Sequence, residues 1–172
     1  GVRAEFVVRP FGQLIDALEA GEVDIVMSQM TMTPERNTRV AFAGPYFVSG
    51  KAILTKSATL ARADDPGDIN RAGITLATLA GSTSEQFVKQ AVPSARLVGT
   101  TDYDQAVSLV LNDEADAMVA DLPICVVSLL RHPDAGLTTL ASPFTFEPIG
   151  AAIPAHDPLF TNLVQNYMNM LE

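Results

Sequence analysis

The sequence contains only one cysteine, Cys125, and this scarcity excludes two kinds of structure. A single thiol forms no internal disulfide, and it cannot assemble a cysteine-based metal site. Its neighbours in the sequence, Ile124, Val126 and Val127, are apolar, which favours a buried, inert thiol over a nucleophile. We find no metal or cofactor motif elsewhere and expect neither group to be bound.

Positive charge and long apolar runs are scarce as well. The chain has 11 Lys and Arg against 20 Asp and Glu, a formal net charge of -9, and no basic run. Because phosphate neutralisation needs clustered Lys and Arg, we expect no nucleic-acid partner. No stretch of about 18 apolar residues exists, so no membrane-spanning helix is predicted. Residues 1–4 show no signal peptide, and we interpret them as the start of a mature, excised or truncated segment.

What the sequence does contain is globular material: 172 residues, 48% hydrophobic and 18% charged, enough for one compact domain or two small lobes. Strands alternating with helices predict an α/β fold. The predicted strands are Glu5–Arg9, 23–28, 51–56, 73–79 and 115–121, and residues 57–71 are expected to be a surface loop. Helices are predicted from Phe11 to Gly21, within 80–91 and 102–112, from Pro123, and over 157–171.

Two helix–strand units, Pro10–Gln29 and Asp102–Asp121, align with each other without a gap. Either the second unit is a structural echo of the first, or both follow a shared βαβ pattern without duplication. A polar residue, Gln29 or Asp121, ends each unit. Since ligands in open α/β sheets bind beyond the carboxyl ends of strands, both residues are candidates for a site.

The stretch 28–37, SQMTMTPERN, presents more polar groups than a turn requires. Its Arg36 can grip a carboxylate through two parallel hydrogen bonds. The alternative is a solvated arginine that pairs with Glu35 or another acid. Phe11, which opens the first predicted helix, is either a core residue or a ring that lies against a ligand.

Residues 81–85, GSTSE, lie where a predicted strand meets a helix. Ser82 and Glu85 have the spacing of a capping box, and the free N–H groups of a helix start favour an anion. Simple capping is the alternative, since the lysine of a P-loop is missing. Asp121 similarly either caps the helix that contains Pro123 or receives a ligand ammonium.

Motifs for catalysis are missing. The sequence holds no GxSxG, HExxH or paired-carboxylate motif, and both histidines, His132 and His156, stand in predicted turns. We therefore expect no catalytic residues and no enzymatic activity.

Residues 17–50, ALEAGEVDIVMSQMTMTPERNTRVAFAGPYFVSG, resemble the central signature of the family 3 periplasmic solute-binding proteins for amino acids. Residues 73–86 and 115–121 resemble motifs of that family's second lobe. The resemblance implies a two-lobe type II periplasmic-binding fold, with lobe 1 formed by 1–46 and 149–172 and lobe 2 by 47–148. The signature positions are filled by Leu18, Gly21, Asp24, Thr31, Thr33, Arg36, Phe42, Pro45 and Tyr46.

The same resemblance implies a role for each candidate. Arg36 would clamp the α-carboxylate of an amino acid, and Thr83, with Ser82 beside it, would hold that carboxylate from the other lobe. Asp121 would pair with the α-ammonium. The remaining predicted contacts are Thr31 and the backbone near Gln29, which would hydrogen-bond around both groups, and Phe11, which would form a wall against the ligand side chain.

Two departures from the family pattern qualify these expectations. Gln29 stands where the family often has a small residue, which would narrow the pocket or replace a direct contact. The family's usual first segment is missing, so we expect a nearly complete second lobe on an incomplete first lobe. We predict that a partner chain, as in a homo-oligomer, or an exchanged segment compensates for it.

The function implied is capture of an amino acid, expected to be polar, for the permease of an ABC importer, without catalysis. The implied location is the periplasm or the cell exterior, with a lipid anchor as one option. Two alternatives stay open: the ligand-sensing domain of a membrane receptor or histidine kinase, and an enzyme similar to cyclohexadienyl dehydratase. The second would need a general acid, and Ile124, where we would look for it, is apolar.

Overall fold

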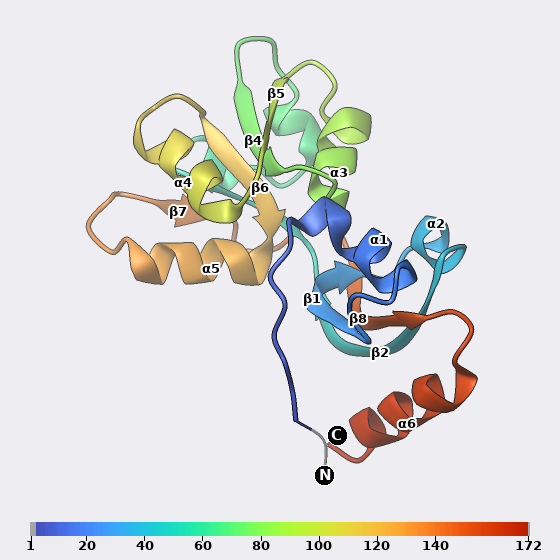
Figure 1. Cartoon of the computed structure of the whole chain (residues 1–172). Helices are drawn as coiled ribbons and strands as arrows, with labels where there is room; N and C mark the ends of the chain where they lie inside the picture. The colour runs from blue at the N-terminus through green and yellow to red at the C-terminus, as the bar shows by residue number, and fades with distance from the viewer. Residues whose placement is uncertain (1–2, 172) are drawn as a thin grey trace. The chain divides into compact units, whose positions relative to one another are not determined.

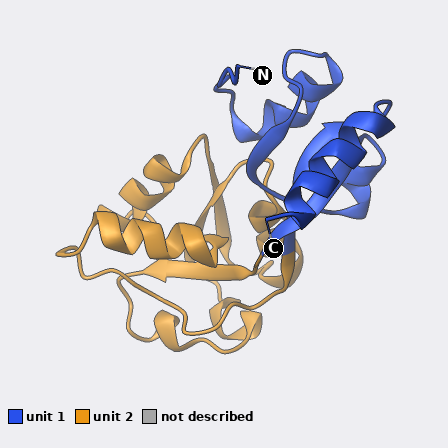
Figure 2. Cartoon of the chain, turned by 90° about the horizontal axis from the view of Figure 1, so that it is seen from below, with its two compact units in different colours: residues 1–47, 148–172 blue, residues 48–147 orange. Residues whose placement is uncertain are grey.

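The structure, a computed structural model, describes residues 3–171. The chain divides into two compact units, residues 1–47 with 148–172 and residues 48–147 (Figure 2). Each boundary lies one residue away from a predicted lobe boundary. That the units act as the two lobes stays a prediction.

The unit of residues 48–147 is built on a five-stranded sheet in the order β5-β4-β6-β3-β7. Figure 1 labels β4, β5, β6 and β7 of this sheet. β4 pairs in parallel with β5 and β6, whereas β3 pairs antiparallel with β6 and β7. The strands are β3 Lys51–Thr55, β4 Thr75–Leu79, β5 Arg96–Thr100, β6 Ala117–Asp121 and β7 Thr138–Thr139. The helices are α3 Thr83–Ala91, α4 Tyr103–Leu111 and α5 Leu122–Arg131, with short 3-10 turns η2 Leu60–Arg62 and η3 Pro66–Ile69.

The core of this unit lies on its central strands. Every residue of β3 and of β6 is buried, and α3, α4 and α5 pack against the sheet. Nearly continuous apolar sequence is typical of strands that are covered on both faces. A charged residue in such a strand is unusual, yet β3 begins with one, Lys51, which is 1% exposed.

The other unit contains a three-stranded sheet in the order β1-β8-β2, with β1 antiparallel to β8. Its strands are β1 Val26–Thr31, β2 Val40–Ser49 and β8 Glu147–Pro154. Its helices are η1 Phe11–Gln13, α1 Leu14–Glu19, α2 Pro34–Asn37 and α6 Pro158–Asn169. A small core joins α1 to the sheet through Leu14, Leu18, Val26, Met30, Val40 and Ala152. Gly21 ends α1 in the left-handed region, with φ of 71°, a conformation that favours glycine.

The predicted strand at Glu5–Arg9 is wrong. Residues 5–9 belong to no strand, and Phe6 and Val8 are 94% and 89% exposed. Side chains that suit a strand do not make one without a neighbouring backbone with which to pair. The next predicted strand, 23–28, lies three residues too early, since β1 runs over Val26–Thr31 and leaves Met27 exposed.

The other predicted strands and helices lie close to observed elements, including the helix predicted over 157–171, which is α6. Four strands, β2, β5, β7 and β8, fall outside the predicted strands. That helix buries no residue fully, and its Leu159, Leu163 and Tyr167 are exposed. The loop predicted over 57–71 contains η2 and η3, whose Leu60 and Ile69 are buried. Among residues 3–171, no helix has the length and apolar character needed to cross a bilayer.

The burial of Cys125 gives a direct test of this packing. The thiol is fully buried, and burial raises its pKa to about 12. Because the thiolate is the reactive form, iodoacetamide at pH 8 should label the native protein at least on the order of a hundredfold more slowly than the urea-unfolded protein. Labelling followed by mass spectrometry measures both rates. Equal rates would contradict the placement of this residue.

Candidate functional site

The predicted site residues fall into two groups, one in each unit. Phe11, Gln29, Thr31 and Arg36 belong to the unit of residues 1–47 and 148–172, and Ser82, Thr83 and Asp121 belong to the unit of residues 48–147.

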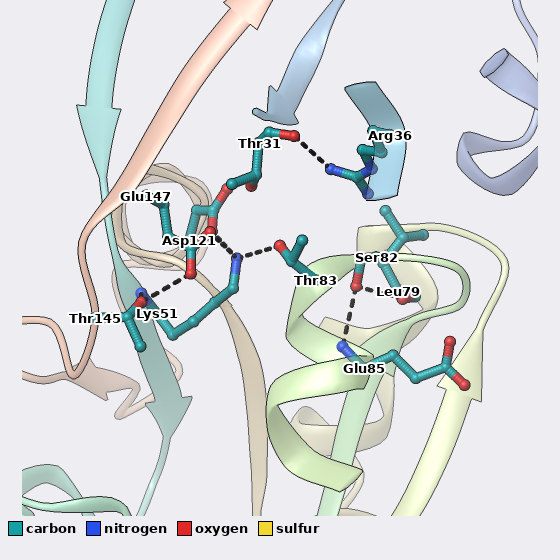
Figure 3. Close-up of polar contacts among 10 residues, drawn as sticks. All are labelled: Thr31, Arg36, Lys51, Leu79, Ser82, Thr83, Glu85, Asp121, Thr145 and Glu147. Atoms are coloured by element: carbon teal, nitrogen blue, oxygen red, sulfur yellow. Dashed lines mark hydrogen bonds and ion pairs between the residues drawn. The ribbon is translucent and has the colours of Figure 1, made fainter. Parts of the chain in front are cut away.

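Arg36 lies on α2, a single helical turn that follows β1. Thr33 precedes this turn, and its hydroxyl accepts a hydrogen bond from the Arg36 amide at 3.3 Å. The Arg36 guanidinium donates to the Thr31 carbonyl at 2.9 Å through Nη1 (Figure 3), and its Cζ lies 5.6 Å from the centre of the Phe11 ring. A hydrogen bond and a cation–π contact therefore orient the guanidinium. Arg36 therefore contacts Thr31 and Phe11, two other residues that the sequence analysis predicted for the site.

Gln29 adopts a backbone conformation that is uncommon for residues other than glycine. Its φ is 52°, in the left-handed region, which costs on the order of 1 kcal/mol. The side-chain Oε1 is buried and has no hydrogen-bond partner among the described residues. Burial raises the pKa of Tyr46, and a hydrogen bond with the Gln29 backbone opposes this shift. A strained residue with an unsatisfied acceptor is a feature often found at binding sites.

The start of α3 is fixed by Ser82 and Glu85. The Ser82 hydroxyl donates to the Leu79 carbonyl at 2.6 Å and accepts from the Glu85 amide at 3.2 Å (Figure 3). The predicted capping box is only half formed, because the Glu85 carboxylate accepts from the Gly81 amide, at 2.8 Å. Hydrogen bonds from Lys89 and from the Gly81 amide hold the pKa of Glu85 below its usual value.

Asp121 is bound to a residue that the sequence analysis missed. Lys51 lies directly opposite it in the β3–β6 ladder, and Lys51 Nζ donates to Asp121 Oδ1 and to Thr83 Oγ1, each at 2.6 Å (Figure 3). The side chains of Lys51 and Asp121 are 1% and 5% exposed. Glu147 adds a second carboxylate, with Oε2 3.7 Å from the same nitrogen. Two carboxylates and a hydroxyl thus surround one buried ammonium.

The proposal that Asp121 caps α5 with its side chain is wrong. Asp121 stands at the N-cap position, but its carboxylate makes no capping hydrogen bond. The sequence did carry a signal for Lys51, since a lysine inside the apolar run KAILT is rarely buried unless it is paired. The partner could not be identified from the sequence, because 70 positions separate the two residues.

With this geometry established, the chain can be compared with known proteins. The model of the bacterial extracellular solute-binding proteins, family 3, matches residues 1–171, and the chain belongs to this family. Its fold is the two-lobe, type II periplasmic-binding fold. Residues 3–171 contain no group of three or more His, Cys, Asp or Glu side chains that could hold a metal ion.

Relatives include both binding proteins and an enzyme. The ABC transporter glutamine-binding protein GlnH of Bacillus subtilis is 29% identical over 81% of this chain and 49% of its own length. The cyclohexadienyl dehydratase of Pseudomonas aeruginosa is 26% identical over 87% of this chain and 55% of its own length. This chain therefore spans about half the length of such relatives.

A solved structure is also similar to this chain in sequence and in fold. The ancestral amino acid-binding protein AncCDT-1, a precursor of cyclohexadienyl dehydratase, is 35% identical and superposes with a TM-score of 0.88. The match covers 99% of this chain and 73% of the ancestral protein. Most of the related proteins bind amino acids and are not enzymes.

The buried ion pair makes stability depend on Asp121. The change Asp121→Asn removes the nearer of the two carboxylates that face the Lys51 ammonium and leaves only Glu147 at 3.7 Å. We expect it to lower the unfolding free energy by about 3 kcal/mol. Urea unfolding followed by circular dichroism measures the loss. The control is Asp104→Asn: the Asp104 side chain is 88% exposed and 3.6 Å from Arg131, so its loss should cost about 0–1 kcal/mol. Equal losses of unfolding free energy in Asp121→Asn and Asp104→Asn would contradict the pairing of Lys51 with Asp121.

The ionisation of Glu85 should make the unfolding free energy depend on pH. Since its pKa is lowered on folding, its contribution is present above the unfolded pKa of about 4.3 and is lost as pH falls through the folded pKa. Glu85→Gln should therefore be less stable than the wild type at pH 7, and the gap should close in more acidic solution. Thermal unfolding at a series of pH values measures the gap, and a gap that does not change with pH would refute this role.

Proposed function

We propose that this protein captures an amino acid outside the cytoplasm and passes it to the permease of an ABC importer. The observation that carries the proposal is the Arg36 guanidinium, oriented by the Thr31 carbonyl and the Phe11 ring. An oriented guanidinium binds a carboxylate through two charge-assisted hydrogen bonds. Membership of the solute-binding family supports this use of Arg36.

Each unit carries side chains that would contribute to recognition. Arg36 takes the ligand carboxylate, Phe11 offers its ring to the ligand side chain, and Thr31 adds hydrogen bonds. The buried Oε1 of Gln29 is an acceptor that suits a ligand N–H group. Thr83 would support an acceptor group of the ligand at the start of α3, which Ser82 caps, and Asp121 shares the Lys51 ammonium with Thr83.

A polar ligand fits these groups best. The candidate residues of the two units supply a cation, carboxylates, hydroxyls and an aromatic ring.

The periplasm or the cell exterior is the location that the family description supports. A second copy of the chain or an exchanged segment is proposed to cover exposed apolar residues of α6, among them Leu159 and Leu163.

Dehydration is a second candidate, favoured by the similarity to cyclohexadienyl dehydratase. The structure places Ile124 on α5, and its side chain offers no proton. The carboxylates of Asp121 and Glu147 lie against Lys51, where one of them would have to act as the acid. Turnover of prephenate by the purified protein tests this candidate, and a complete absence of turnover would remove it.

Titration calorimetry with the twenty amino acids tests the leading proposal, and the complete gene product is the sample to use. We expect binding of a polar amino acid, and Arg36→Ala should weaken it at least about tenfold, because one charge-assisted hydrogen bond contributes about 1.5–3 kcal/mol.

The matched control is Arg39→Ala, which removes a surface arginine paired with Asp16 and Glu19. This variant should bind the amino acid with the same affinity as the wild type. The proposal would be contradicted if no amino acid gave a heat of binding. It would also be contradicted if Arg36→Ala and Arg39→Ala lowered the affinity equally.

A further inference from the structure

Lys51, the buried lysine of β3, changes how strongly Asp121 can attract the ammonium group of a ligand. An α-ammonium approaching Asp121 would meet a carboxylate that already accepts a hydrogen bond from Lys51 at 2.6 Å. It would also come close to a second positive charge, and like charges repel most strongly where water is excluded. Lys51 therefore lowers the attraction that an isolated aspartate would give to a ligand ammonium.

Lys51 is held where it is by its backbone as well as by its charge. Its amide donates to Thr145 Oγ1 at 2.9 Å, and its carbonyl accepts from the Phe144 amide at 2.7 Å. The preceding residue, Gly50, has no room for a side chain, because a Cβ there would lie 2.0 Å from the Thr145 carbonyl oxygen. The segment 143–145 therefore packs closely against the backbone of β3 at Lys51.

The contacts of the ammonium also define the hydrogen bonding of Thr83. The Thr83 hydroxyl oxygen accepts a hydrogen bond from Lys51 at 2.6 Å, so Lys51 fixes the position of this side chain. Thr83 is the first residue of α3, where backbone N–H groups are donors. This part of the unit therefore suits an acceptor group of the ligand, such as a carboxylate.

Glu147 is the other negative charge of the cluster. Its Oε2 lies 3.7 Å from Lys51 Nζ, while its Oε1 accepts from the Thr145 hydroxyl at 3.0 Å. Glu147 is thus bonded within the segment that covers Lys51, and it lies against the same ammonium as Asp121. It is nevertheless the one alternative position for a ligand ammonium in this cluster, and the experiment must include it.

We propose that Lys51 supplies to Asp121 the ammonium that an amino acid ligand would otherwise supply, so that the α-amino group of the ligand is dispensable. The ligand class then widens from amino acids to small carboxylates of the same shape, including dicarboxylates and deaminated analogues. This inference rests on the proposed function, because it assumes that Arg36 binds a carboxylate.

Calorimetry with four matched pairs of compounds tests it. Each pair joins an amino acid to the same molecule without its α-amino group: L-glutamate and glutarate, L-glutamine and glutaramate, L-arginine and 5-guanidinopentanoate, L-histidine and imidazolepropionate. For any pair that binds, the two dissociation constants of the wild type should agree within tenfold. A preference for the amino acid of more than tenfold overturns the inference, and this result needs no variant.

Variants then assign the effect to Lys51. Lys51→Gln should raise the preference for the amino acid at least tenfold, whereas Lys51→Arg, which keeps the charge, and Lys56→Gln, which removes a lysine elsewhere in the same unit, should not. Circular dichroism checks that each variant is folded. A wild type that prefers the amino acid, together with a Glu147→Gln variant that loses this preference, would place the ligand ammonium on Glu147 and refute the inference.

The outcomes separate the two proposals. Binding by the amino acids alone counts against the inference and leaves the proposed function standing. If none of the eight compounds binds, the proposed function fails for these ligands, and the inference fails with it.

Discussion

The buried ion pair between Lys51 and Asp121 is the constraint on which the candidate site of the second unit depends. An ammonium that is 1% exposed is stable only with a charged partner close by, and Asp121 lies opposite it in the β3–β6 ladder. The same nitrogen reaches the first residue of α3. One side chain therefore fixes the relative position of two strands and a helix start, and the polar groups at that point are set before any ligand arrives.

The pair also lies where the chain passes from one unit to the other. The unit boundaries fall at residues 47/48 and 147/148, and both ends of the second unit meet at Lys51, through the Thr145 hydroxyl and the Glu147 carboxylate. The ion cluster therefore ties together the two chain ends of the unit of residues 48–147.

The sequence allowed much of this to be predicted, and the failures have physical reasons. The helices near Phe11, Thr83 and Pro123 were predicted because caps and apolar spacing are local signals. The family resemblance singled out Arg36 and Thr31 through its signature and Phe11 through its position, and in the structure Arg36 contacts both of the others. Residues 5–9 were predicted as a strand from composition alone, whereas a strand requires a partner that composition does not reveal. Lys51 was missed because its role depends on a contact with a residue 70 positions away.

A crystal structure of the complete gene product with its bound ligand is the most direct test of this account. It should show the ligand carboxylate on the Arg36 guanidinium, with Lys51 Nζ still within hydrogen-bond distance of Asp121 and of Thr83. A ligand ammonium seated on Asp121, with Lys51 displaced from it, would contradict the account.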